Sequence, residues 1–134
     1  MLKRILLAYD GSESARRAFN EAVDLAARYD AELTVLGVAR PPEFGSEVET
    51  EAVIENSRKH YHHVLKLLKD KAPKAHFEVV VGHPAVRITA YAEANGIDLI
   101  VLGHRGETLF ERWLIGSVAK KVMSYAPCSV MVVR

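Results

Sequence analysis

The sequence has few features that would tie it to an oxidising compartment, a membrane or a nucleic acid. Its single cysteine, Cys128, cannot form a disulfide within the chain, which is typical of a cytoplasmic protein. The 18 basic and 17 acidic residues leave a net charge of +1, which favours neither nucleic acid nor an anionic membrane as a partner. No apolar run approaches the roughly 18 residues of a membrane span. The run at residues 5–9 is too short for a signal peptide. We therefore expect a soluble, cytoplasmic domain.

Short apolar runs alternate with longer amphipathic stretches along the chain. The runs have the length and aliphatic composition of strands and cover residues 5–9, 33–38, 77–81, 99–102 and 130–133. Apolar stripes of helical spacing lie between them, at residues 15–29, 54–68, 84–92 and 118–125. This order predicts one α/β domain over residues 1–134, with an open, doubly wound, Rossmann-like sheet of five parallel strands and four helices.

The segment after the fourth strand, GHRGETLFERWLIGS, is unusually rich in glycine. Gly103, Gly106 and Gly116 precede Ser117, where the fourth helix is expected to begin. Glycines let phosphate oxygens approach backbone N–H groups, and a helix start adds unpaired donors and a positive dipole end. Neither standard phosphate loop occurs here. The spacing alone is therefore equally compatible with a phosphate site and with a tight structural turn.

Asp10 follows the first strand, in the sequence Tyr9-Asp10-Gly11-Ser12. In open parallel sheets, ligands bind beyond the carboxyl ends of the strands, where the strand order reverses. If the first and fourth strands are neighbours, Asp10 and the glycine segment meet in one crevice. Asp10 is also compatible with a role as a helix cap for the residues from Ser12 onward.

The motif G-x2-G-x9-G-S, together with ILLAYDGSESA, VGHPA, DLIVLGHRG and APCSVMVVR, resembles the universal stress protein family over essentially the whole chain. The resemblance implies the strand order 3-2-1-4-5 and ATP, with Mg²⁺, as the ligand. It implies that Asp10 contacts the ribose or the adenine edge and that the backbone of Val38 meets the adenine. Arg105 would pair with a phosphate. Main-chain N–H groups of five residues would bind the phosphates: Gly103, Gly106, Gly116, Ser117 and Val118.

Three functions remain open at this stage. The preferred one is an ATP-binding regulatory module of the stress-response type, because no catalytic base for phosphoryl transfer is evident. The alternatives are a slow ATPase or nucleotidyl-transfer enzyme on the same site, and a dimerising interaction domain without nucleotide. Glu107 departs from the expected pattern, since its carboxylate would either oppose the terminal phosphates or help to hold Mg²⁺.

The remaining candidate residues favour structural roles. His60 and His63 share a helix face, with His62 between them. Because a metal site needs a third ligand nearby, this pair favours a solvated helix face rather than a metal site. His83 and His104 lie at strand exits and could reach the crevice. Cys128 enters an apolar strand and is expected to be inert. That fifth strand would lie at a sheet edge, which favours a homodimer, as the family resemblance also implies.

Overall fold

A parallel sheet runs through the centre of the molecule. We describe residues 1–40, 47–106 and 114–134 from a computed structural model. The strands are β1 (Arg4–Ala8), β2 (Glu32–Ala39), β3 (His76–Val81), β4 (Leu99–Gly103) and β5 (Ser129–Val133). They are ordered β3-β2-β1-β4-β5, and every neighbouring pair is parallel. The predicted strand order and fold class are confirmed.

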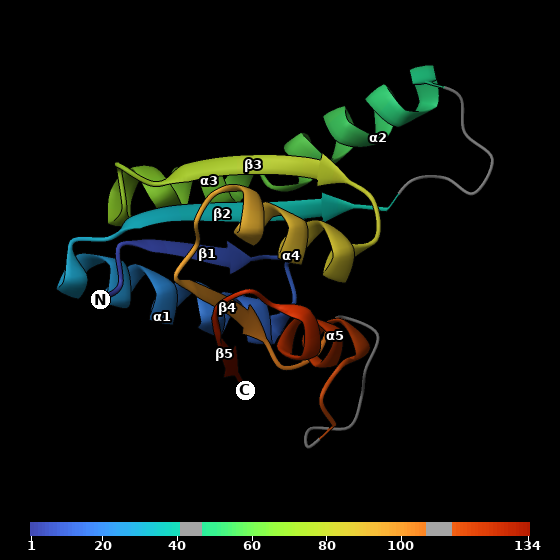
Figure 1. Ribbon diagram of the computed structural model, residues 1–134. Coiled ribbons are helices and arrows are strands. Elements are labelled where there is room, and N and C mark those ends of the chain that lie inside the picture. Colours follow the sequence, from blue (N-terminus) through green and yellow to red (C-terminus); the bar gives the residue numbers. More distant parts are fainter. Residues whose placement is uncertain (41–46, 107–113) are drawn as a thin grey trace.

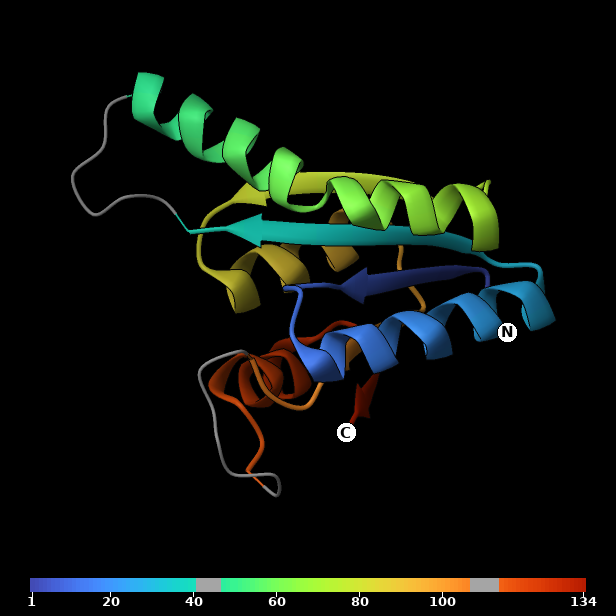
Figure 2. The same cartoon turned by 180° about the vertical axis from the view of Figure 1, so that it is seen from behind.

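Helices cover both faces of this sheet. The structure describes α1 (Glu13–Tyr29), α2 (Glu47–His60), α3 (His62–Lys71), α4 (Pro84–Ala94) and α5 (Ser117–Tyr125). Figures 1 and 2 show α1 and α3 against one face and α4 and α5 against the other. Alternate strand residues pack into the cores on the two faces of the sheet: Ile5 and Leu7 pack on the α1 side, and Leu6 packs on the α4 side. Both faces are therefore buried, which explains why the strands read as nearly continuous apolar runs.

The described residues form five helices, one more than predicted. The stripe over residues 54–68 predicts one helix, but α2 ends at His60 and α3 begins at His62. Tyr61 lies between them, buried, with its ring centroid 5.7 Å from that of Phe77 and 5.9 Å from that of Tyr9. A Cβ on Gly37 would stand 2.8 Å from Cε2 of Tyr61, so the glycine in β2 makes room for this ring. None of the described helices combines the length and apolar character needed to cross a membrane.

The chain reverses direction across the sheet at β1, which places two strand exits together. From β1 the chain moves outward to β2 and β3, and then returns to β4 on the other side of β1. The register pairs Ala8 of β1 with Leu102 of β4, so the residues that follow these two strands emerge side by side. Beyond β1, the N–H of Tyr9 still donates to the carbonyl of Leu36, at 3.0 Å. This junction is where an open α/β sheet is expected to bind ligands.

Candidate functional site

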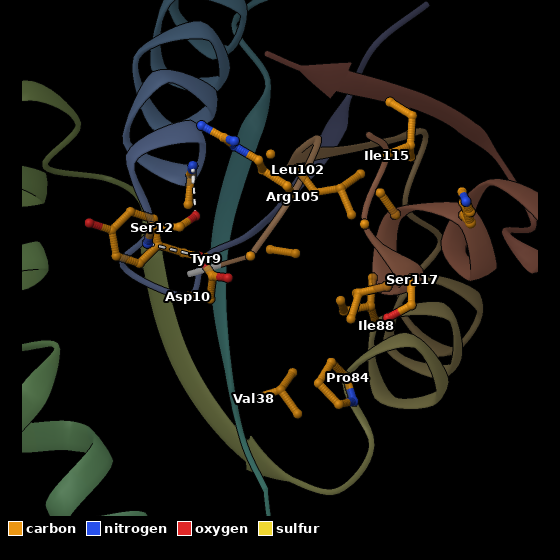
Figure 3. A pocket seen from close by; sticks show the side chains of 18 of the residues that line it. Tyr9, Asp10, Ser12, Val38, Pro84, Ile88, Leu102, Arg105, Ile115 and Ser117 are labelled. Carbon is orange, nitrogen blue, oxygen red and sulfur yellow. Dashed lines mark hydrogen bonds between the residues drawn. The ribbon is translucent and has the colours of Figure 1, made fainter. Parts of the chain in front are cut away.

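A cavity of about 550 Å³ opens at this junction, beyond the carboxyl ends of β1, β2 and β4 (Figure 3). The helix starts of α4 and α5 and the first turn of α1 complete its wall. The structure brings all eight residues that the resemblance assigned to a nucleotide around this one cavity: Asp10, Val38, Gly103, Arg105, Gly106, Gly116, Ser117 and Val118.

One side of the cavity is apolar. Val38 from β2 and Pro84 from α4 lie next to each other on this side in Figure 3, and Ile88 follows one turn along α4. Leu36 and Leu102 extend the apolar lining along the strand ends. Such a surface suits a flat ring system, because the ring can replace water against the aliphatic side chains. Pro84 and Ile88 were not predicted as site residues, although Pro84 lies only three residues after the end of β3.

Asp10 is held at the edge of the cavity by the beginning of α1. Its Oδ1 accepts the N–H of Ser12 at 2.9 Å. Ser12 is the N-cap of α1, because its hydroxyl accepts the N–H of Ala15 at 3.2 Å. Asp10 therefore orders the turn before the cap and lines the cavity as well. Its Oδ2 lies beside Gly106, where a Cβ would stand only 3.3 Å from this oxygen.

The three glycines of the motif make different contacts. A Cβ on Gly103 would lie 2.8 Å from the carbonyl carbon of Ser14, so this glycine lets β4 pack closely on the first turn of α1. Gly106 has only the Asp10 carboxylate near its Cβ position. The N–H of Gly116 donates to the carbonyl of His104 at 2.6 Å. That donor is therefore engaged within the protein, whereas the resemblance assigned it to a phosphate.

The start of α5 offers unpaired donors to the cavity. Gly116 is the N-cap, with φ −64° and ψ 158°, and its carbonyl accepts the N–H of Lys120 at 3.0 Å. The N–H groups of Ser117, Val118 and Ala119 precede this first helical bond and have no carbonyl partner within the helix. All three residues line the cavity. Together with the positive end of the helix dipole, they form a site suited to an anion.

Among the described residues that line the cavity, basic side chains outnumber acidic ones. Its described lining includes Arg40, Arg105 and Lys120 against the one carboxylate of Asp10. Nη1 of Arg105 is buried and has no hydrogen-bond partner among the described residues. Ser14 donates its hydroxyl to the Arg105 carbonyl at 2.7 Å, which ties this residue to α1. Sequence analysis missed Arg40, two residues after Val38, and Lys120, four residues after Gly116.

The histidines and Cys128 are not among the described residues that line the cavity. His83 is exposed and His104 is buried, and neither is among the residues that line the cavity. Nε2 of His63 lies 3.4 Å from the Tyr9 hydroxyl. Within the described residues, no three His, Cys, Asp or Glu side chains are grouped to hold a metal ion. Burial raises the pKa of the Cys128 thiol, which keeps the thiol protonated at neutral pH. Glu107 lies outside the described residues, as does the side chain of His60.

Known proteins are similar to this chain in sequence and in fold along almost its whole length. A model of the universal stress protein family matches residues 1–134. A putative universal stress protein of Staphylococcus haemolyticus is 38% identical over 139 residues, covering 98% of this chain and 84% of that protein. The structure of the universal stress protein UspA from Lactobacillus plantarum is 32% identical, with a TM-score of 0.81 over 98% of this chain and 97% of that one.

Two further solved structures are complexes with adenine nucleotides. A universal stress protein in complex with cAMP covers 98% of this chain and 97% of its own, with a TM-score of 0.77 and 24% identity. A universal stress protein from Archaeoglobus fulgidus in complex with dAMP covers 100% and 98%, with a TM-score of 0.66 and 17% identity. At these identities the likeness establishes the shared fold. The full-length family match and the relatives above 30% identity show that the chain belongs to the universal stress protein family.

Proposed function

We propose that this protein is an ATP-binding regulatory module of the stress response, with the nucleotide in the cavity between β1, β4 and α5. The observation that carries the proposal is that one cavity has an apolar side, at Val38 and Pro84, and also contains the N–H donors at the start of α5. A nucleotide has two matching parts, an aromatic base and its phosphates. The cAMP and dAMP complexes show that other proteins of this fold have been solved with adenine nucleotides.

In this arrangement the adenine lies against Val38 and Pro84, and the phosphates lie at the start of α5. The three N–H groups of Ser117, Val118 and Ala119 donate to phosphate oxygens, and Arg105 adds a positive charge to the lining. Asp10 stands close enough to the junction to accept a hydrogen bond from the ribose or the adenine edge.

Mg²⁺ fits this site only when it binds together with the phosphates. Among the described lining residues, the side-chain oxygens available to Mg²⁺ are the Asp10 carboxylate and the Ser117 hydroxyl, because the Ser12 hydroxyl is engaged as the N-cap of α1. Two such groups do not make a metal cage, and the cation would take its remaining ligands from phosphate oxygens and water. When bound, Mg²⁺ would neutralise part of the polyphosphate charge.

The described lining favours binding over catalysis. Phosphoryl transfer needs a group that orients or deprotonates the nucleophile. Asp10 is the one carboxylate of the described lining, which contains no histidine or cysteine, and its Oδ1 is engaged with the Ser12 N–H. Asp10 is therefore better placed to hold a ligand than to activate water, so a regulatory role is preferred to turnover.

The proposal is tested by substituting Gly116 with valine. The φ and ψ of Gly116 are accessible to any residue, so the substitution crowds the phosphate path without straining the backbone. We expect the wild-type protein to bind ATP in the micromolar range by isothermal titration calorimetry. Gly116→Val should abolish this binding while the far-UV circular dichroism spectrum stays native.

The control is Ser124→Val, which places the same side chain at an exposed position near the end of α5. This variant should bind ATP as the wild type does. A folded Gly116→Val protein with unchanged ATP affinity would remove the phosphates from the start of α5. Failure of the wild type to bind any adenine nucleotide would overturn the proposed function as a whole.

A further inference from the structure

Lys120 joins the cavity from the helix whose start carries the unpaired N–H donors. It lies four residues after Gly116, and its own N–H closes the first helical bond of α5, at 3.0 Å to the Gly116 carbonyl. Lys120 is an exposed residue that lines the cavity. The next residue, Lys121, is also exposed and on the same helix, but it is not among the lining residues.

Helix geometry directs the Lys120 side chain toward the start of α5. Every Cα–Cβ bond of an α-helix tilts toward the N-terminus, and long side chains lie over the preceding turn. From Lys120 that turn holds Gly116 and Ser117, where the free N–H groups are. The ammonium group therefore has access to an anion that the helix start holds, and it adds a full charge to the partial charge of the dipole.

The N–H groups and the ammonium group differ in how they respond to ligand charge. The N–H donors of Ser117, Val118 and Ala119 are fixed by the helix and satisfy the oxygens nearest to them. Lysine is a flexible point charge, whose attraction grows with each phosphate charge added nearby. Asp10 is the one acidic residue of the described lining, and it follows β1 and not α5.

We propose that Lys120 sets the preference of the cavity for nucleotides with more phosphates, so that ATP binds more tightly than ADP and ADP more tightly than AMP. This inference rests on the proposed nucleotide site and adds its specificity. Lys120 contacts the phosphates furthest from the nucleoside, whereas the α5 N–H groups bind those closer to it. Removing the charge at Lys120 therefore weakens ATP selectively and leaves most of the AMP affinity in place.

The experiment compares Lys120→Gln with Lys121→Gln, two variants of equal net charge on the same helix. Dissociation constants for ATP, ADP and AMP are measured by isothermal titration calorimetry at one fixed, low ionic strength without Mg²⁺. We expect Lys120→Gln to weaken ATP about fivefold and AMP less than twofold, the size of one partly solvated charge contact. Lys121→Gln should change each constant less than twofold. Lys120→Arg should restore the wild-type ratio of the ATP and AMP constants, since it keeps the charge.

Three results would overturn the inference while leaving the nucleotide site intact. In the first, Lys120→Gln weakens ATP and AMP by the same factor, which would make Lys120 a general contributor to the cavity. In the second, the two glutamine variants behave alike, which would reduce the effect to net charge. In the third, Lys120→Gln leaves the ATP constant unchanged. A wild-type protein that binds none of the three nucleotides contradicts the proposed function itself, and so is distinguished from all of these.

Discussion

Gly103 packs closely on the first turn of α1 at the base of the cavity. A Cβ at this position would stand 2.8 Å from the carbonyl carbon of Ser14 and 2.9 Å from the backbone nitrogen of Ala15. Both atoms belong to the first turn of α1, which the Ser12 cap holds in place. The hydroxyl of Ser14 also donates to the Arg105 carbonyl at 2.7 Å. The exit of β4 and the start of α1 are therefore fixed to one another, which positions the cavity wall.

Alanine at Gly103 is expected to destabilise the fold more than alanine at Gly106. Two of the three atoms nearest to a Cβ on Gly103 are backbone atoms of α1 that cannot give way, so the added methyl group should lower the free energy of unfolding by about 1–3 kcal/mol. At Gly106 the nearest atom is the Asp10 Oδ2 at 3.3 Å, the end of a side chain that can rotate. Neither glycine has a positive φ, so the comparison isolates packing. Urea denaturation of both variants measures the difference, and an equal or reversed order would contradict this account.

The family resemblance, and not spacing alone, assigned the candidate site residues, and it did not separate their roles. Gly103, Gly106 and Gly116 look equivalent in a motif, because spacing says nothing about which atoms each residue meets. In the structure, Gly103 packs on α1 and Gly106 lies beside the Asp10 carboxylate. The N–H of Gly116 donates to the His104 carbonyl. The sequence does not indicate that Lys120 lines the cavity, because a lysine on an amphipathic helix is usually a solvated side chain. Only the fold shows that this exposed position borders the cavity.

At the scale of the elements, Asp98 joins the turn before β4 to the start of β1. Its Oδ2 accepts the N–H of Lys3 at 2.8 Å and that of Arg4 at 2.9 Å. These two backbone hydrogen bonds hold the pKa of the Asp98 carboxyl below its ordinary value. The Asp98 N–H in turn donates to the Arg4 carbonyl at 2.9 Å. The charged carboxylate therefore helps to align the two central strands at the end opposite the cavity.

Asp98→Ala is expected to lower the melting temperature at neutral pH, because the two N–H groups lose their charged acceptor. A lowered pKa in the folded state means that this stabilisation is present above the ordinary carboxyl pKa and is lost as the pH falls through the lowered pKa. The difference in melting temperature between the wild type and Asp98→Ala should therefore shrink between pH 7 and about pH 3.

Asp70→Ala is the control for this prediction, since Asp70 is an exposed residue near the end of α3. It should change the melting temperature less at neutral pH. A melting-temperature difference for Asp98→Ala that stays constant or grows toward acid pH would show that the carboxylate charge does not contribute as proposed.

Two features of the helices differ from what the periodicity of apolar residues predicts. The apolar stripe over residues 54–68 continues through Tyr61, so periodicity predicts a single helix. Tyr61 instead turns the chain while its ring packs beside Phe77 and over Gly37. Such a break depends on space that a residue distant in sequence leaves open, which helical periodicity does not record. Tyr29 and Tyr125 were also placed on buried stripes, but they are the last residues of α1 and α5 and are 52% and 76% exposed.

For the whole molecule, alternation of strands and helices was sufficient to predict the parallel sheet and its two helical layers. Alternation does not determine the strand order, because several orders satisfy right-handed crossovers equally well. The order β3-β2-β1-β4-β5 was available only through the family resemblance, and the structure confirms it. That order makes β3 and β5 the edges of the sheet, and β5 is the edge beside the strand that leads into the glycine motif.

We predict that the protein forms a homodimer through β5. Val130, Met131 and Val132 are half-buried in the single chain, so an apolar edge strand is left incompletely covered. The His104 N–H donates to the Val133 carbonyl at 2.7 Å, so Val133 turns its backbone toward the β4 side. Backbone groups alternate sides along a strand, and those of Val132 therefore face the open edge. Two copies can satisfy this edge by pairing antiparallel across a two-fold axis.

Val132→Pro tests this interface without removing a hydrogen bond to β4, because proline deletes an N–H that points away from the sheet. Sedimentation velocity at tens of micromolar protein should show a dimer for the wild type and a monomer for Val132→Pro. The circular dichroism spectrum and the ATP affinity of the variant should stay close to those of the wild type, since the cavity lies at the β1–β4 junction. A Val132→Pro protein that remains dimeric would place the interface elsewhere, and a monomeric wild type would show that the β5 edge is protected within one chain.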